Sequence, residues 1–508
     1  MKKTVLFCAV AMLVFVILIG CGKKENASPQ GAETESPSSA YPKINNGQPI
    51  TLRIAMQPNY LPTLNKVPTP ESPEVVLAAD QIADEFRKIH PNVTIEYDRS
   101  MPPTNATEAA EWFTTQIAGG TCPAIAFTWN WYTPRGWYAD LTDVMETPNE
   151  YVPGNKRWRD QFPEYLWNKS NNTNLNNRVQ AVPIWLAPGP LTAYFYNVDL
   201  FKKFNLAPPK TWEDLRHVSK TLRDNGYTAL LPFHGNQVIS TDLWPIYFSI
   251  GPCYSANLMD PLDYDKNGII APVEELRGVK ANVHNPVIHE YAREVLYLVK
   301  EMLTEMYPKG FEHINLDDEW NSGNTGMKQD GSWAFQTEAS NTKRSFEFGL
   351  TPAPVVTAET SKYVAKIEFT KAGPYQPDSE ALNVMLPAVE ENQAMFDAAV
   401  AYLKFLTNPE IMSQMILEKA THIGSVYDCA IPPLLEDWMN RPFPIMPNVG
   451  NWPRGWTTEG NEALGRELEL WIKDNTPDDV FFARWNRLQQ EDADRAIRVQ
   501  NVDTSGWK

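Results

Sequence analysis

The chain has 508 residues, with 45 Lys or Arg against 62 Asp or Glu, which gives a formal net charge of −17. This length exceeds what one hydrophobic core usually fills, so two lobes are expected. The negative charge disfavours nucleic acid or a bare anionic membrane as a partner. The histidines form no H-E-x-x-H pair, so nothing supports a zinc hydrolase.

The first 49 residues predict export and anchoring. Residues 1–20 combine two early lysines with an uncharged apolar stretch, the pattern of a signal peptide. The segment "LIGC", which ends at Cys21, resembles a bacterial lipobox, and this resemblance implies cleavage before Cys21 and its lipidation, palmitate included. An ordinary cleaved export signal or an N-terminal anchor is the alternative. Residues 21–49 are rich in Ser, Pro, Asn and Gly, as expected of a solvated tether.

Residues 51–127 predict alternating strands and helices. Residues 51–56, 93–97 and 122–127 are β-rich or apolar runs. Apolar residues recur every three or four positions from Pro73, where Ser72 is expected to cap the helix, and again from Thr104 until Gly119-Gly120 stops the pattern. The order β-α-β-α-β predicts a parallel sheet with helices on its faces.

Aromatic side chains follow several of these strands. In open parallel sheets, ligands bind beyond the carboxyl ends of the strands. Rings offer an apolar face to a sugar, while Tyr and Trp can also hydrogen-bond its hydroxyls. Packing is the alternative for any single ring. The ligand-binding candidates that follow strands in the first lobe are Tyr60, Trp129, Asn130, Trp131 and Trp185.

Several later stretches resemble one known family. They are "YNVDLF" at 196–201, "PPKTWEDL" at 208–215, "GNTGMKQDGSW" at 323–333, "FGLTPAP" at 348–354 and "AVAYLKFL" at 399–406. Their order and spacing are similar to those of family 1 extracellular solute-binding proteins, the carbohydrate type, which serve ATP-binding-cassette (ABC) importers. Thr211 and Asp214 also form a predicted capping box for a helix.

The resemblance implies an α/β fold of the type II periplasmic-binding-protein kind, with two lobes that each contain a mainly parallel sheet flanked by helices. Crossing strands would join the lobes. The expected boundaries are residues 50–186 and 351–425 for lobe 1, and residues 187–350 and 426–508 for lobe 2. Lobe 2 would contribute Asp242, Trp244 and Trp333 to an interlobe ligand site. Asp242 follows Ser240-Thr241 and is alternatively a helix cap.

The function implied by the resemblance is capture of a sugar, with an oligosaccharide favoured, and its delivery to the membrane permease of an ABC transporter. Ligand would favour a closed state by contacting both lobes. We expect an extracytoplasmic monomer on the bacterial cell membrane with no catalytic residues and no organic cofactor. Two alternatives stay open: a solute-binding protein for a peptide or other polar solute, and a membrane-tethered glycoside hydrolase, which needs only two suitably spaced carboxylates. Pairing among Cys122, Cys253 and Cys429 is also open.

A calcium-loop pattern lies in the insert at residues 254–285. The stretch "DYDKNGIIAPVE" matches D-x-[DN]-x-[DN]-G-x₅-E. It predicts a structural calcium ion held by Asp263, Asp265, Asn267, the carbonyl of Ile269 and Glu274. Pro261 disfavours a regular entering helix, Ala271 offers no side-chain oxygen, and Pro272 suits the first turn of an exiting helix. An acidic surface turn that needs no metal is the alternative.

Overall fold

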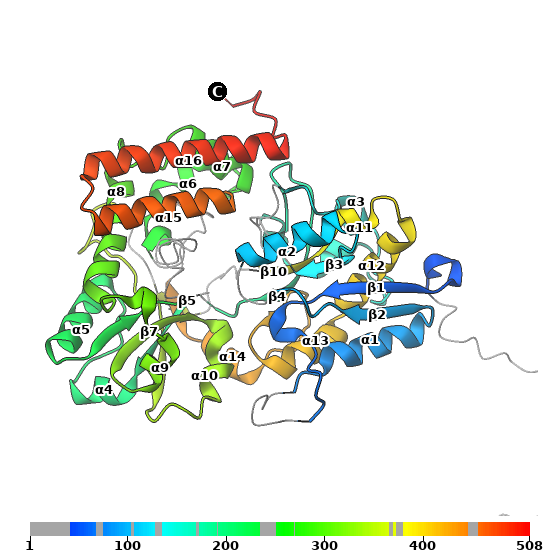
Figure 1. Ribbon diagram of the computed structural model, residues 1–508, viewed down its shortest axis with the longest axis horizontal. Helices are drawn as coiled ribbons and strands as arrows, with labels where there is room; N and C mark the ends of the chain where they lie inside the picture. The colour runs from blue at the N-terminus through cyan, green and yellow to red at the C-terminus, as the bar shows by residue number, and fades with distance from the viewer. Residues whose placement is uncertain are drawn as a thin grey trace, which may run out of the picture.

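A computed structural model of the protein describes residues 41–67, 75–102, 106–127, 135–168, 172–189, 192–233, 250–268, 270–364, 369–371, 379–444 and 456–507. Two main sheets divide these residues into two lobes. Figure 1 shows the sheet with β1 and β2 in the right half of the molecule and the sheet with β5 and β7 in the left half. The expectation of two α/β lobes is confirmed.

The first lobe is built on a six-stranded sheet. Its strands, in spatial order, are β11 (Ile423–Gly424), β4 (Val182–Leu186), β10 (Ser379–Val384), β3 (Ile125–Phe127), β1 (Ile50–Ala55) and β2 (Val93–Tyr97). Its helices are α1 (Ala78–Ile89), α2 (Ala106–Ala118), α3 (Thr142–Met145), α11 (Leu386–Val389), α12 (Gln393–Leu406), α13 (Pro409–Lys419) and α14 (Pro433–Met439). The predicted β-α-β-α-β unit is confirmed, because β1 pairs in parallel with both β2 and β3.

The second lobe is built on a four-stranded sheet. Its strands, in spatial order, are β6 (Thr228–Leu231), β7 (Thr325–Gly331), β5 (Thr192–Asn197) and β8 (Phe348–Pro352). Its helices are α4 (Val198–Lys203), α5 (Trp212–Asp224), α6 (Met259–Leu262), α7 (Pro272–Lys280), α8 (Glu290–Glu301), α9 (Leu316–Asn321), α10 (Phe335–Ala339), α15 (Thr458–Lys473) and α16 (Asp478–Gln500). A separate two-stranded ribbon pairs β9 (Phe369–Lys371) with β12 (Pro442–Pro444).

Most strands of each sheet run in one direction, as expected, but each sheet also contains at least one strand that runs the opposite way. β10 runs antiparallel to β3 and β4, and β5 runs antiparallel to β7 and β8. The physical reason is the connectivity: β5 and β10 are the strands that arrive from the other lobe. Each enters its sheet at the edge where the neighbouring strands end, so it has to run in the opposite direction.

The boundaries between the lobes also differ from the expected ones. Residues 351–378 were assigned to lobe 1, but β8 ends at Pro352 in the second sheet, and Val355 and Val356 are buried in the second core. Trp438 of α14, which was assigned to lobe 2, lies in a hydrophobic cluster that contains residues of both lobes. Its ring lies edge-on to Phe335 of α10, with centroids 4.8 Å apart, so α14 bridges the two lobes.

Local signals fixed several helix ends. α2 stops before Gly120, whose φ of +66° suits glycine. Thr211 and Asp214 form the predicted capping box at the start of α5. However, α1 begins at Ala78 rather than at Pro73. Glu418 of α13 accepts hydrogen bonds from the backbone N–H groups of Leu77 (2.7 Å) and Ala78 (3.1 Å), so a side chain distant in sequence caps this helix.

Candidate ligand-binding site

The chain crosses between the lobes at one edge of each sheet. In the first sheet, Ser379 at the start of β10 pairs with Leu186 at the end of β4. In the second, Thr192 at the start of β5 pairs with Gly331 at the end of β7. The crossings after β4 and after β8 therefore join the edges at which the neighbouring strands end, and the chain crosses a third time between β11 and α15. Ligands bind at this kind of edge in open α/β sheets.

Trp333 lies at this edge of the second sheet, directly after β7. Its indole ring is half-buried and covers Gly331 so closely that a Cβ added at Gly331 would lie 2.1 Å from ring atom Cη2. Phe233, two residues beyond the end of β6, presents its ring at 69° to the indole, with centroids 5.5 Å apart. Only glycine at position 331 permits the indole to pack this closely on the backbone. The arrangement fixes the ring orientation while part of the indole stays exposed, as a platform for a ligand requires.

Tyr60 and Trp185 are too deeply buried to form a ligand platform. Both rings are 0% exposed and stack on each other, with centroids 5.0 Å apart and planes 22° apart. The Tyr60 hydroxyl lies 3.1 Å from both Thr421 Oγ1 and His422 Nδ1. In this conformation neither ring has a face that a ligand could reach, so packing is their role. The strand-end rule located them at the correct edge but could not tell a buried ring from an exposed one.

The remaining predicted ligand residues are not among the described ones. They are Trp129, Asn130 and Trp131 after β3, and Asp242 and Trp244 after β6. Trp129, Asn130 and Trp131 follow β3 in the sequence. β3 ends at Phe127, at the same edge of the sheet as β1 and β4.

Two polar residues at this edge were not predicted from the sequence. Gln57 follows β1 and Glu380 is the second residue of β10. Gln57 Nε2 donates a hydrogen bond to Glu380 Oε2 at 3.0 Å. Gln57 follows a strand, so the rule applied to Tyr60 could have included it. Glu380 stands at the start of a strand and had no such signal.

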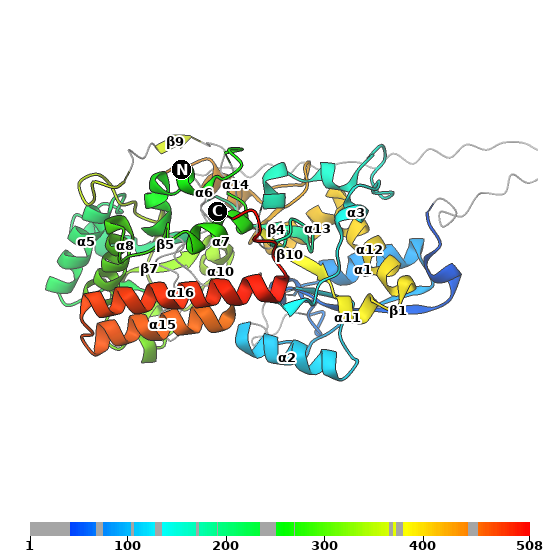
Figure 2. The same ribbon diagram turned by 90° about the horizontal axis from the view of Figure 1, so that it is seen from above.

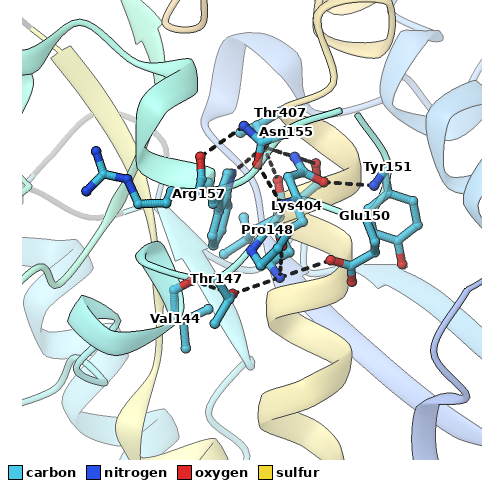
Figure 3. Close-up of polar contacts among 12 residues, drawn as sticks. Val144, Thr147, Pro148, Glu150, Tyr151, Asn155, Arg157, Lys404 and Thr407 are labelled. Carbon is cyan, nitrogen blue, oxygen red and sulfur yellow. Dashed lines mark hydrogen bonds and ion pairs between the residues drawn. The ribbon is translucent and has the colours of Figure 1, made fainter. Parts of the chain in front are cut away.

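A buried polar cluster lies around Lys404 and residues 147–151 (Figure 3). The ammonium group of Lys404 on α12 donates to the Pro148 carbonyl (2.7 Å), Glu150 Oε2 (3.0 Å) and Thr147 Oγ1 (3.2 Å). These acceptors use all three of its N–H donors. Nearby Tyr151 contacts His90, which precedes β2, so the cluster lies at the amino ends of the parallel strands. We infer that it fixes residues 147–151 to α12 and binds no solute.

The predicted calcium loop brings its acidic residues together. Carboxylate oxygens of Asp263, Asp265 and Glu274 all lie within 4.8 Å of one another, and Glu274 is only 7% exposed. Glu274 Oε1 accepts from Tyr264 N at 2.7 Å, and Asp263 Oδ2 accepts from Gly268 N at 3.0 Å. The chain turns with the left-handed backbone that the pattern requires at Gly268, where φ is +81°.

The surroundings of the loop partly follow the expectation. α7 begins at Pro272 as predicted, and the entering helix is reduced to the single turn of α6, which contains Pro261. Ile269 is outside the described residues. Three hard oxygen donors at this spacing fit a calcium ion better than a transition metal.

The two α/β lobes, joined by chain crossings at the ends of their strands, form a two-lobed α/β fold. The family model of the bacterial extracellular solute-binding proteins matches residues 69–413, and the chain belongs to this family. A curated relative, an uncharacterized ABC transporter extracellular-binding protein of Pyrococcus horikoshii, is 27% identical over 139 residues. The alignment covers 26% of this chain and 28% of that relative, so the chain matches about a quarter of its length.

Solved structures show the same fold. A chitin oligosaccharide binding protein has a TM-score of 0.60 at 14% identity, covering 88% of this chain and 99% of that one. The cyclic α-maltosyl-1,6-maltose binding protein of Arthrobacter globiformis scores 0.56 at 16% identity, with coverage of 88% and 99%. A structure from a study of xylan utilization in Caldanaerobius polysaccharolyticus scores 0.55 at 16% identity, with coverage of 87% and 100%.

Membership of this family makes the protein an extracellular solute-binding protein. Among the helices of the described ranges, none combines the length and the apolar character needed to cross a membrane.

Proposed function

We propose that the protein captures a sugar, preferably an oligosaccharide, between its lobes and delivers it to the permease of an ABC transporter. The observation that carries the proposal is the position of Trp333, a half-buried indole that packs closely on Gly331 at the ligand edge of the second sheet. A flat apolar ring suits the C–H face of a pyranose. The sugar ligands named for two structurally similar proteins support the same class.

The rest of the site is proposed from sequence position. Trp129 and Trp131 after β3 would face Trp333 and Trp244 across the ligand, while Asn130 and Asp242 would hydrogen-bond its hydroxyls. A ligand that contacts both lobes favours the state in which they approach each other. On this proposal the protein forms and breaks no covalent bond, and one protein molecule acts alone.

Titration of intrinsic tryptophan fluorescence with a panel of glycans and peptides tests the proposal. A sugar-specific response that is lost in both Trp131→Ala and Trp333→Ala would support it, and a full response in both variants would refute these assignments. A response to peptides alone would favour the peptide-binding alternative. Chromatography of the recovered oligosaccharide tests the hydrolase alternative, because shortened products would show catalysis.

Two further features complete the proposal. Lipidation of Cys21 would anchor the chain to the cell membrane, with residues 22–49 as the tether. A Cys21→Ala variant that still fractionates with membranes would contradict this.

A calcium ion held by Asp263, Asp265, Asn267, the Ile269 carbonyl and Glu274 would stabilise the second lobe, because the loop leads directly into α7.

A further inference from the structure

Trp333 lies on a short turn between a strand and a helix. β7 ends at Gly331, the turn covers Ser332–Ala334, and α10 begins at Phe335. Phe335 is 1% exposed, and its ring lies against that of Phe195 of β5, with centroids 5.7 Å apart. Because the turn has only three residues, the position of α10 relative to β7 limits where the indole ring can lie.

A buried group of charges joins β7 to α10. Lys328 Nζ lies 3.3 Å from Asp330 Oδ2 on the same strand and 3.3 Å from Glu338 Oε2 on α10. The side chains of Lys328 and Asp330 are 15% and 14% exposed, and that of Glu338 is 4% exposed. Glu338 Oε1 also accepts from Arg344 Nε at 2.6 Å and from Trp320 Nε1 at 3.0 Å. Charged residues before and after the turn are therefore connected to one another.

The ammonium group of Lys328 is charged in this position. Burial by itself would lower its pKa, but the carboxylates of Asp330 and Glu338 outweigh this effect and raise the pKa above its ordinary value. Well-packed apolar residues can often replace a buried ion pair without loss of stability. What a fully connected group of buried charges can add is a fixed geometry.

The same group reaches the backbone on which the indole packs. Asp330 Oδ1 accepts a hydrogen bond from the N–H of Gly331 at 2.8 Å, while Asp330 Oδ2 faces Lys328. The ring of Trp333 lies directly on Gly331. One carboxylate thus connects Lys328 to the residue that carries the ring.

From this geometry we propose that Lys328 is a positioning residue of the ligand site: by joining Asp330 and Glu338 it fixes the turn between β7 and α10, and with it the orientation of the indole. The proposal rests on the sugar-binding function proposed above, in which the Trp333 ring stacks on a sugar. A ring that is already oriented loses little freedom when the ligand binds, so more of the contact energy appears as affinity. Lys328 itself acts without touching the sugar.

The first readout needs no ligand. In protein labelled with 5-fluorotryptophan, the ¹⁹F resonance of Trp333 is the one that is missing from Trp333→Phe. Lys328→Met keeps the length of the side chain and removes its charge. In this variant the Trp333 resonance should shift and narrow because the ring becomes mobile, whereas the resonance of Trp185, which is fully buried in the first lobe, should stay in place.

The second readout is affinity. Calorimetry of the full mature chain with chitin, malto- and xylo-oligosaccharides identifies the glycan that wild type binds most tightly. Lys328→Met should bind this glycan roughly three- to tenfold more weakly, the affinity equivalent of ordering one side chain on binding. Glu338→Gln keeps the side-chain shape and weakens the same link from the α10 side. It should show both changes, and it replaces Lys328→Met if that variant does not fold.

The matched control is Lys404→Met. Lys404 is a comparably buried lysine, with a side chain that is 8% exposed and pairs with Glu150 at 3.0 Å, and its cluster lies at the amino ends of the parallel strands. Lys404→Met should lower the melting temperature, as Lys328→Met does. It should leave the Trp333 resonance and the glycan affinity unchanged.

The outcomes separate the two proposals. A Trp333 resonance that is unchanged in both Lys328→Met and Glu338→Gln overturns the positioning role and leaves sugar binding intact. Equal losses of affinity in Lys328→Met and Lys404→Met overturn it too, because lower stability would then be the cause. A wild type that binds no glycan overturns the proposed function, while the fluorine spectra still decide whether Lys328 orients the indole.

Discussion

Leu175 of the first lobe and Gln500 of the second lobe are joined by a hydrogen bond. The backbone N–H of Leu175, in a loop of the first lobe, donates to Gln500 Oε1 at 3.1 Å, and the Asn176 side chain donates to the Gln500 carbonyl at 2.9 Å. Gln500 is the last residue of α16, which Figure 2 shows running from the second lobe toward the first. The helix lies beyond residue 413, where the match to the family model ends.

A small apolar cluster surrounds this contact. Leu175 is 5% exposed and packs with residues of α7 and α16, namely Leu276, Val279, Ala493 and Ala496. α7 is the helix that follows the acidic loop. The second lobe therefore contacts the first lobe through its C-terminal helix, in addition to the covalent chain crossings.

Breaking this contact should change how the lobes are arranged. Leu175→Asp places a charge in an apolar cluster, which is unfavourable unless the contact opens. We expect the radius of gyration of the ligand-free protein to rise in X-ray scattering while the far-ultraviolet circular dichroism is unchanged. Leu64→Asp is the control, since Leu64 is 77% exposed in the same lobe. Superimposable scattering of wild type and Leu175→Asp would show that the contact does not hold the lobes.

Substitutions of Trp185 and Trp333, both predicted as ligand residues, should differ in their effect on the stability of the protein. Trp185 is fully buried against Tyr60, so Trp185→Ala should lower the free energy of unfolding by about 3–5 kcal/mol, the usual cost of deleting a large buried ring. Trp333→Ala should cost much less because the ring is only half-buried, and should act on ligand affinity instead. Denaturant unfolding followed by circular dichroism measures both. Equal losses of stability would mean that Trp333 is also a packing residue.

The features that were predicted correctly from the sequence depend on residues that are neighbours in the chain. The capping box of Thr211 and Asp214, the stop at Gly120 and the start of α7 at Pro272 each involve groups within a few positions, and all were correct. The order of strands and helices up to Phe127 also follows from local periodicity. The family resemblance added the two lobes, which the chain length alone only suggested.

The features that were not predicted correctly depend on contacts between residues that are distant in the sequence. The cap of α1 comes from Glu418, more than 300 positions from Ala78. The Gln57–Glu380 pair spans 323 positions. The burial of Tyr60 follows from Thr421 and His422, which arrive with β11. Periodicity and residue type carry no information on such pairs, so the sequence located the ligand edge but not which of its side chains are exposed.

Stability should fall in mildly acidic solution because of two buried histidines. Burial lowers the pKa values of His284 and His422 to about 3 in the folded state, against about 6.5 in an unfolded chain. Between these values the unfolded state binds protons that the folded state does not. Stability is thus fully present above about pH 6.5 and decreases toward pH 3, by up to about 1.4 kcal/mol per pH unit for each histidine.

Histidine variants test whether His422 causes this dependence of the unfolding free energy on pH. His422→Gln should flatten the dependence of the unfolding free energy on pH between pH 4.5 and 6.5, although the loss of contacts to Tyr60 and Thr421 will lower stability overall. His217→Gln, at an exposed position, should leave the slope unchanged. Parallel curves for wild type and His422→Gln would contradict the assignment.

Calcium should raise the melting temperature, because the acidic loop loses charge repulsion only when a cation binds. Glu274 Oε1 accepts a hydrogen bond from Tyr264 N, and Glu274 Oε2 accepts one from Ala271 N at 2.9 Å. Saturation at 100 times the dissociation constant adds about 2.7 kcal/mol to the free energy of unfolding. For a domain of 150–250 residues this corresponds to roughly 5–10 °C.

Substitutions in and beside the loop distinguish a built site from general screening of negative charge. Glu274→Gln should abolish the rise because it removes the carboxylate that can bind the ion with both oxygens. Asp260→Asn should keep it, since Asp260 lies outside the five predicted ligands and its side chain is 97% exposed. Magnesium at the same concentration should stabilise less, because it demands a smaller octahedral shell. A melting temperature that saturating calcium leaves unchanged, or one that rises equally in Glu274→Gln, would remove calcium from the second lobe.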